Sequence, residues 1–271
     1  MAEIRVLVVG AAGRMGSEVV RAISKADDMT LVGAVDRNRV GEDAGAVAGI
    51  PPVGVNITDS LSAAIPASSP DVAVDFTVPA SVAANVKTAL KAGVACVVGA
   101  TGMTEENLSE IAALCEERKT PTFVAPNFAI GAVLMMQFAA QAAPHFEAAE
   151  IIELHHAGKL DAPSGTALRT AKLMQAATGC RAGSPNPAEP RAQGDAGASP
   201  SRGQTEGRIH LHSVRLPGLV AHQEVIFGGL GETLTLRHDS TSRECFMPGV
   251  LLAIRRVRDL KGLVVGLEEL L

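Results

Sequence analysis

The stretch Ile4-Arg5-Val6-Leu7-Val8-Val9-Gly10-Ala11-Ala12-Gly13-Arg14-Met15-Gly16 predicts the fold of the first half of the chain. Residues 3–10 are a largely apolar, β-branched run that is typical of a parallel strand whose two faces are both covered. A glycine turn follows, and a helical pattern then continues through Val19, Val20 and Ile23. This order of strand, glycine turn and helix lets backbone N–H groups approach a pyrophosphate at the start of the helix.

The next strand, residues 30–35, supports a dinucleotide site. It ends in Asp36, 20 residues after Gly16, where an acidic side chain accepts hydrogen bonds from the adenosine ribose. Arg37 can pair with a 2′-phosphate, so the two residues predict use of both NADH and NADPH. Two alternatives stay open. Ala12 replaces the usual second glycine, so the turn could serve only tight helix–strand packing, and Arg37 could be a solvated charge.

Strands then alternate with helices as far as residue 126. Strands are expected at 71–76, 95–98 and 122–125, and helices at 80–92 and 104–118. Residues 41–70, rich in Gly, Pro and Ser, are expected to form a mobile connection with little regular structure. The alternation predicts an α/β fold with a Rossmann-type doubly wound parallel sheet. Small residues at the carboxyl ends of its strands, Gly99, Ala100 and Thr101, are expected to line the cofactor crevice.

After Asn127 the pattern changes, which predicts a second, α+β domain with a mixed or antiparallel sheet. Its expected elements are helices at 130–143 and from Ser164, strands at 149–154, 208–215, 221–227 and 232–237, and a flexible loop at 181–206. A helix at 242–257 and a strand at 262–265 close the chain. We expect residues 1–127 to bind the dinucleotide, with 239–271 packing back on them, and residues 128–238 to bind the substrate and form oligomer contacts.

Residues 153–167 concentrate chemical groups. His155 and His156 are adjacent, so on an extended backbone they point to opposite faces and only one reaches a given reacting atom. Ser164-Gly165-Thr166 lies at a helix start, where free N–H groups favour a carboxylate or phosphate. Lys159 adds a mobile positive charge. A His pair alone is more often structural, and Pro163-Ser164 could be an ordinary helix cap. The crowding nevertheless favours a site for an anionic small molecule beside proton donors.

Composition narrows the function classes. The 271 residues are 47% hydrophobic and 20% charged, which is enough apolar content for a full core. The net charge of −5 does not favour binding to nucleic acid or to an anionic membrane. The four cysteines show no Cys-x-x-Cys spacing, and His210 and His212 lack a third ligand, so no metal site is expected. The first apolar stretch is too short for a signal peptide or membrane span, so a cytoplasmic protein is expected.

The chain resembles the 4-hydroxy-tetrahydrodipicolinate reductases (dihydrodipicolinate reductases) of bacterial lysine and diaminopimelate biosynthesis. The residues that carry the resemblance are 10–16, Asp36-Arg37, Ala125-Pro126-Asn127-Phe128, 155–167 and His212-Ser213-Val214-Arg215-Leu216-Pro217-Gly218. The pattern from His155-His156-x-x-Lys159 to Ser164-Gly165-Thr166 is very specific to that family. Departures are Ala12 for a glycine, Ala100 where threonine is usual, and Asp36 where some members carry Glu.

The resemblance implies roles in coenzyme binding, catalysis and substrate binding. NADH or NADPH would be held by Gly10, Ala11, Ala12, Gly13, Arg14, Met15, Asp36, Arg37, Gly99, Ala100, Thr101, Ala125, Pro126, Asn127 and Phe128. His155 would be the acid/base group and Lys159 a proton donor. The substrate, a small dicarboxylate, would be held by His156, Lys159, Ser164, Gly165 and Thr166. The family is usually a homotetramer joined through the sheets of the second domain.

Three further interpretations stay open. Another two-domain NAD(P)H reductase would share the first 126 residues but has no reason to carry His-His-x-x-Lys beside Ser-Gly-Thr. A regulatory module that binds NAD(H) without turnover usually needs a partner surface or a DNA-binding segment, and neither is evident here. Arg215, in Arg-Leu-Pro-Gly, could support the substrate or the closure of a cleft.

The role of Arg37 gives a testable prediction. Arg37→Ala should raise the KM for NADPH and leave the KM for NADH unchanged, because only NADPH carries the 2′-phosphate. Steady-state kinetics with each coenzyme measures both values. No selective change would mean that Arg37 does not contact the 2′-phosphate.

Overall fold

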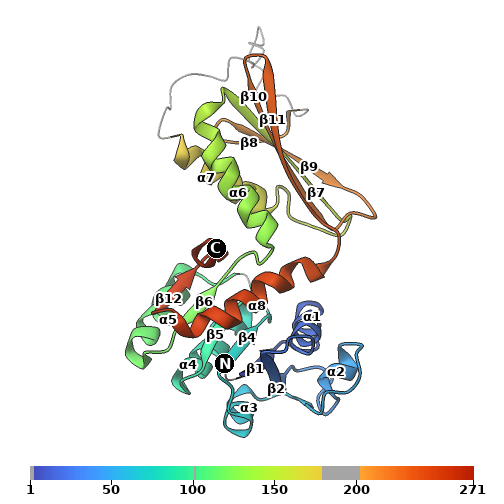
Figure 1. Cartoon of the computed structure of the whole chain (residues 1–271), viewed down its shortest axis with the longest axis vertical. Helices are drawn as coiled ribbons and strands as arrows, with labels where there is room; N and C mark the ends of the chain where they lie inside the picture. Colours follow the sequence, from blue (N-terminus) through green and yellow to red (C-terminus); the bar gives the residue numbers. More distant parts are fainter. Residues whose placement is uncertain (1–2, 101, 179–201) are drawn as a thin grey trace. The chain divides into compact units, whose positions relative to one another are not determined.

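The computed structural model describes residues 3–100, 102–178 and 202–271 (Figure 1). The chain divides into two compact units, Met1–Ile130 with Arg243–Leu271, and Gly131–Ser242. Thr101 and residues 179–201 lie outside the described residues, so the expectations for Thr101 and for most of the 181–206 loop are not addressed by the structure.

The first unit is built on a seven-stranded sheet in the order β12-β6-β5-β4-β1-β2-β3, and every pairing in it is parallel. Its strands are β1 (Ile4–Val9), β2 (Met29–Val35), β3 (Ile57–Thr58), β4 (Val72–Asp75), β5 (Ala95–Val98), β6 (Thr122–Val124) and β12 (Leu263–Val265). The strand order reverses at β1, since β2 lies on one side of it and β4 on the other. This is the predicted doubly wound parallel sheet, and the reversal is the point where such sheets bind ligands.

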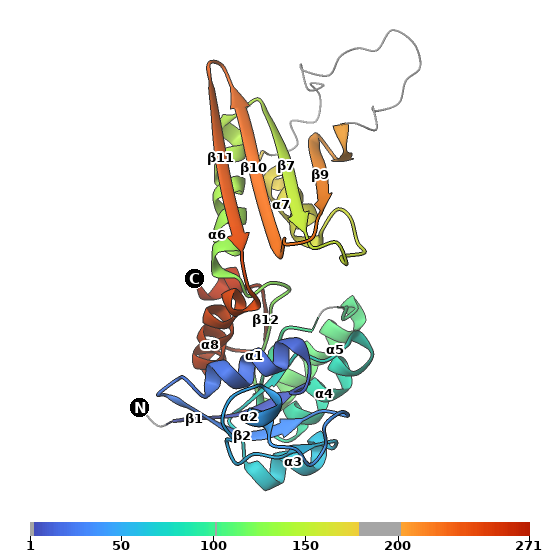
Figure 2. The ribbon, with the colours of Figure 1, turned by 90° about the vertical axis from the view of Figure 1, so that its right-hand side faces the viewer.

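Helices cover both faces of this sheet. The helices of the unit are α1 (Arg14–Ile23), α2 (Ala44–Val47), α3 (Leu61–Ser68), α4 (Pro79–Lys91), α5 (Glu105–Arg118) and α8 (Met247–Arg256). A buried cluster that includes Leu7, Val86 and Ile111 packs α3, α4 and α5 on one face, while α1 and α8 pack together elsewhere on the sheet (Figure 2). Because both faces are covered, the strands are continuous apolar runs, which is why their positions could be predicted.

The expectation of little regular structure over residues 41–70 was wrong. This segment contains α2, β3 and α3. The Asp43 side chain organises it by accepting hydrogen bonds from the backbone N–H groups of Ala46, Val53 and Gly54, at 3.0, 3.1 and 2.8 Å. Ser60 caps α3 by accepting from the Ala63 N–H. Two capping side chains therefore hold a segment whose composition is typical of a loop.

The second unit is a five-stranded mixed sheet with helices on one face (Figure 2). Its elements are α6 (Ile130–Ala142), β7 (Ala148–His155), α7 (Gly165–Ala177), β8 (Gln204–Glu206), β9 (Ile209–Arg215), β10 (Ala221–Gly229) and β11 (Glu232–Ser240). The strand order is β11-β10-β7-β9-β8, and only β7 and β9 pair in parallel. The mixed sheet agrees with the prediction, but residues 204–206, expected in a flexible loop, form β8.

The glycine turn after β1 tolerates no side chain at Gly16. A Cβ atom there would overlap the carbonyl oxygen of Gly10 and lie 2.7 Å from its carbonyl carbon. Gly16→Ala should therefore force α1 away from the turn and lower the free energy of unfolding by about 1–3 kcal/mol. Thermal unfolding measures the loss. Gly228→Ala is the control, because no atom lies within 4 Å of its added Cβ; equal effects of the two substitutions would contradict the close approach.

Candidate functional site

The helix-covered face of the second sheet changes from apolar to polar toward the carboxyl end of β7. One row across four strands consists of Leu211, Ile151, Val225 and Leu236. The next row on that face consists of Ser213, Glu153, Gln223 and His238, and the row after it of Arg215, His155, Ala221 and Ser240. Strand register therefore gathers the polar groups at one end of the unit, beside the loop that leads into α7.

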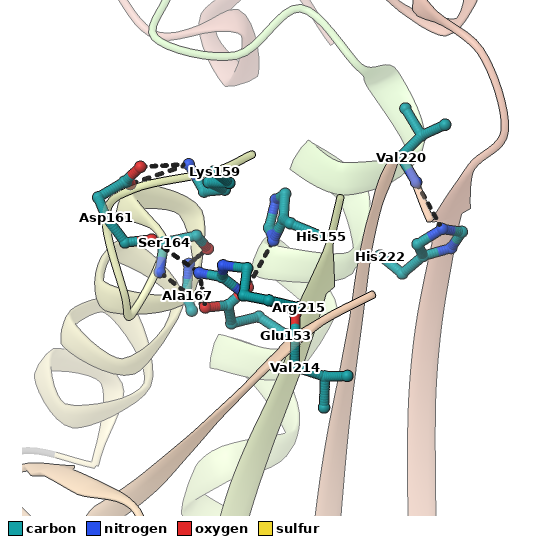
Figure 3. A network of polar contacts seen from close by, with 10 residues as sticks. All are labelled: Glu153, His155, Lys159, Asp161, Ser164, Ala167, Val214, Arg215, Val220 and His222. Carbon is teal, nitrogen blue, oxygen red and sulfur yellow. Dashed lines mark hydrogen bonds and ion pairs between the residues drawn. The ribbon is translucent and has the colours of Figure 1, made fainter. Parts of the chain in front are cut away.

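Glu153 is the centre of this polar end (Figure 3). Its side chain is completely buried. Arg215 donates two parallel hydrogen bonds to it, Nη1 to Oε2 and Nη2 to Oε1, both 2.8 Å long. Nδ1 of His155 lies 2.5 Å from Oε2, and the backbone N–H of Ser164 donates to Oε1 at 3.2 Å. One carboxylate thus joins β7, β9 and the start of α7.

These partners keep Glu153 ionised. Burial alone would raise its pKa, but hydrogen bonds from His155, Arg215 and Ser213 outweigh burial and lower the pKa to about 2. A paired arginine and several hydrogen-bond donors are the conditions under which a buried carboxylate retains its charge. A fixed negative charge therefore lies against the imidazole of His155.

Lys159, expected to add a mobile positive charge, pairs with Asp161 in this structure. Its Nζ lies 2.8 and 2.9 Å from the two carboxylate oxygens of Asp161, and this ion pair lowers the pKa of Asp161 (Figure 3). Arg215 also donates to the backbone carbonyl of Asp161 at 2.7 Å. The Lys159 loop is therefore connected to Glu153 through Arg215. Asp161 is exposed, so we expect the ion pair to be weak and exchangeable.

Ser164 is the N-cap of α7, as the simpler interpretation held. Its Oγ accepts from the Ala167 N–H at 3.2 Å, and the residue is buried. The first turn of α7 contains no acidic residue, and the space around the Gly165 Cα is open. The positive end of the helix dipole is thus left without an acidic side chain of that turn, which suits an anion.

His156 directly follows the last residue of β7, His155. It is exposed, and its carbonyl accepts from the Lys159 N–H at 3.1 Å. His156 and Lys159 therefore share one short turn beside the start of α7.

The residues expected to bind the dinucleotide lie in the first unit, at the carboxyl ends of neighbouring parallel strands. Residues 10–15 connect β1 to α1, and Gly10 has the positive φ of +84° that the turn requires. The N-cap of α1, Gly13, makes no side-chain cap, and no acidic residue lies in the first turn. These features fit a pyrophosphate, whose oxygens would accept hydrogen bonds from the uncapped N–H groups at the start of α1.

Asp36 contacts the glycine turn directly. Its Oδ2 accepts from the Ala12 N–H at 3.0 Å, and its Oδ1 accepts from the Asn38 N–H at 2.8 Å. Arg37 beside it is exposed, and the described part of the chain offers it no ion pair. Both side chains are therefore placed at the end of β2, where a ribose and a 2′-phosphate would lie in this fold.

Two further loops expected to hold the coenzyme follow the neighbouring strands β5 and β6. The N–H groups of Gly99 and Ala100 donate to the backbone carbonyl of Asp75, at 2.9 and 3.3 Å. A Cβ at Gly99 would overlap the ring of Phe76, which packs 5.8 Å from the ring of Phe128. Residues 125–128 thus meet the end of β4 and the Gly99 loop through these aromatic rings.

Sequence reasoning missed Glu153 and did not identify the direct partner of Arg215. The alternation of side chains between the two faces of a strand offered a signal. Glu153 occupies the same face of β7 as Ile151, a fully buried position, and a charged residue there requires a partner. The partner could not be found, because Arg215 lies 62 residues away and reaches Glu153 only through the parallel pairing of β7 with β9.

The remaining histidines of the sheet have other partners. His212 Nε2 lies 2.7 Å from Glu150 Oε2, and His210 Nδ1 lies 2.9 Å from the carbonyl of Arg202. Among residues 3–100, 102–178 and 202–271, no three His, Cys, Asp or Glu side chains are grouped as a metal site. In the same residues no helix has the length and apolar character needed to cross a membrane.

Comparison with known proteins agrees with this geometry. Residues 4–128 match the family model for the N-terminus of dihydrodipicolinate reductase, and residues 131–271 match the model for its C-terminus. The 4-hydroxy-tetrahydrodipicolinate reductase of Moorella thermoacetica is 54% identical over 271 residues, which cover 100% of this chain and 99% of the relative. That of Desulfitobacterium hafniense is 51% identical, with 100% of both chains covered.

Comparison with solved structures supports the same family. A dipicolinate-bound dihydrodipicolinate reductase from Paenisporosarcina sp. TG-14 matches with a TM-score of 0.85 and 41% identity, covering 99% of this chain and 100% of that one. An amine dehydrogenase from Mycobacterium smegmatis shares only the fold, with a TM-score of 0.67 and 16% identity over 97% and 95% of the two chains. The chain belongs to the dihydrodipicolinate reductase family of NAD(P)H-dependent oxidoreductases.

Proposed function

We propose that this chain reduces 4-hydroxy-tetrahydrodipicolinate to tetrahydrodipicolinate in the diaminopimelate and lysine pathway, with His155 as the acid/base group. The observation that carries the proposal is the Glu153 cluster. It places His155, the Lys159 loop and the N-terminus of α7 around one buried carboxylate in a chain of this family. The named relatives support the substrate, and so does the dipicolinate that is bound to the Paenisporosarcina protein.

The chemistry requires an acid beside a dicarboxylate. Loss of water from the substrate gives a cyclic conjugated imine, and NAD(P)H supplies a hydride to ring carbon 4. The electron pair that moves toward the ring nitrogen must be matched by a proton. His155 is placed to supply it, since its side chain is 14% exposed, and in the described part of the chain Nε2 has no hydrogen-bond partner. A positioned acid contributes roughly 10²–10⁴-fold to such a step.

The substrate carboxylates match the groups that surround the acid. The backbone N–H groups of Gly165 and Thr166 open α7, and we propose that they hold one carboxylate, together with the Ser164 hydroxyl. The oxygen of that hydroxyl already accepts from Ala167, so its proton is free to donate. Lys159 and His156, in the adjacent turn, would contact the same ligand and would supply a second proton donor.

We propose that the coenzyme is held by the turn at residues 10–15, by Asp36 and Arg37, and by the loops at Gly99, Ala100, Thr101 and residues 125–128. The uncapped start of α1 would bind the pyrophosphate, and Asp36 the ribose. Acceptance of both NADH and NADPH follows, because Asp36 suits a free ribose and the exposed Arg37 suits a 2′-phosphate.

We also propose a cytoplasmic homotetramer. Helices α6 and α7 cover one face of the second sheet, while the opposite face carries Ile152, Leu154 and Ile226, each only partly buried. Light scattering after size-exclusion chromatography should give a mass four times that of the chain. A monomer across the concentration range would contradict the assembly.

The reaction is tested by oxidation of NADPH and NADH at 340 nm, with the substrate made in situ from pyruvate and aspartate semialdehyde by the preceding synthase. Rapid oxidation that requires the synthase product is expected. Coenzyme binding without oxidation would instead support a sensor or another reductase. The chain contains no Trp or Tyr, so nicotinamide fluorescence reports binding over a weak protein background.

His155→Ala should lower kcat by about 10²–10⁴-fold and leave the coenzyme Kd unchanged, because the acid acts on the transition state. Steady-state kinetics and nicotinamide fluorescence measure the two effects. His145→Ala is the control, since His145 is an exposed histidine of the same unit outside the cluster. Equal losses in kcat and coenzyme binding, with the fold intact, would exclude His155 as the acid.

A further inference from the structure

The proposed function assigns no role to Glu153, although its carboxylate contacts His155, Arg215 and the start of α7. It is completely buried, and it faces His155, Arg215 and the Ser164 N–H at once. A carboxylate in such surroundings is costly unless it is fully paired. Its position on β7, two residues before His155, places it on the same face of the sheet.

We propose that Glu153 is a positioning residue that fixes the tautomer of His155. The carboxylate holds the ring proton on Nδ1, and Nε2 is thereby left as the nitrogen that exchanges a proton with the substrate. The inference rests on the proposed function of His155 as the acid/base group. It assigns the direction in which the imidazole acts, which the family resemblance alone does not give.

The contact between His155 and Glu153 fixes which ring nitrogen carries the hydrogen. An ionised carboxylate has only acceptors, so Nδ1 of His155, 2.5 Å from Oε2 of Glu153, must carry it. In neutral imidazole the other nitrogen then bears the lone pair. Tautomers are set in this way wherever one ring nitrogen is held by a carboxylate and the other performs the chemistry.

Arg215 and Ser164 prevent the carboxylate from turning away. The bidentate guanidinium fixes the plane of the carboxylate, and the Ser164 N–H takes a further position on Oε1. Because the same guanidinium donates to the Asp161 carbonyl, the Lys159 loop and the His155 ring share one rigid support. The orientation of the acid is therefore determined by buried contacts rather than by the substrate.

Protonated His155 carries N–H bonds at both nitrogens. As the hydride reaches ring carbon 4 of the substrate, the electron pair it displaces moves toward the ring nitrogen. The Nε2–H bond of His155 breaks, and its proton bonds to that ring nitrogen. The imidazole becomes neutral and keeps its Nδ1–H on Glu153, and water returns a proton to Nε2 before the next turnover.

Glu153→Gln should reverse the tautomer. Arg215 has only donors, so it should retain the single oxygen of the substituted amide side chain together with the Ser164 N–H. The amide NH₂ would then face Nδ1 and place the ring hydrogen on Nε2. Histidine-selective ¹⁵N NMR at alkaline pH, where imidazoles are neutral, distinguishes the two nitrogens. The His155 signals are identified among the seven histidines by their loss in His155→Ala.

We expect wild-type protein to show Nδ1–H and Glu153→Gln to show Nε2–H, with kcat lowered about 10²-fold or more and coenzyme Kd unchanged. Glu150→Gln is the matched control. Glu150 lies on the same strand and also pairs with a histidine, His212, and an arginine, Arg202. This variant should leave the His155 signals and kcat unaltered.

An Nε2–H tautomer in the wild-type protein would overturn the inference, even if Glu153→Gln did not fold. Unchanged kcat in a folded Glu153→Gln variant would overturn it as well. The NMR readout needs no turnover, so it separates this inference from the proposed function. Nδ1–H in the wild type with full activity of His155→Ala would reject the acid role but retain the effect of Glu153 on the ring.

Discussion

The site depends on one buried charge. Taking a carboxylate and a guanidinium out of water costs several kcal/mol per ion, and removing one partner of such a pair costs roughly 3–5 kcal/mol. Glu153 and Arg215 meet this cost with two parallel hydrogen bonds, the His155 ring and the Ser164 N–H. The same contacts that stabilise the charge also bring together His155, the Lys159 loop and the start of α7. A substitution at Glu153 is therefore expected to affect both stability and the proposed acid.

Acidic side chains also organise the first unit, but in a different electrostatic setting. Asp36 accepts from the N–H of Ala12, and Asp75 accepts from Thr77 and Asn85. Burial raises the pKa of Asp75, and the neutral donors around it only partly offset that effect. The pKa of Glu153 moves the other way, because a guanidinium and an imidazole face it. A cationic partner thus distinguishes the Glu153 carboxylate of the proposed catalytic cluster from the Asp75 carboxylate of the first unit.

Local patterns predicted much of the fold. Fully buried parallel strands are continuous apolar runs, so β1, β2, β4 and β5 were visible in the sequence. Features that depend on tertiary position were not. The contacts of Asp43 with Val53 and Gly54 gave residues 41–70 a structure that their composition opposes, and β8 has no apolar pattern. The crowding of polar groups in residues 155–166 was apparent from residue types, yet Glu153 was overlooked because its partner Arg215 is set by strand register.

The most direct measurement is a crystal structure of the chain with coenzyme and dipicolinate bound. Dipicolinate carries two carboxylates on a six-membered nitrogen ring, as the substrate does. We expect that Nε2 of His155 faces the ligand while Nδ1 stays on Glu153, and that one ligand carboxylate accepts from the first N–H groups of α7. A ligand bound away from α7, or a His155 ring turned so that Nδ1 leaves Glu153, would contradict it.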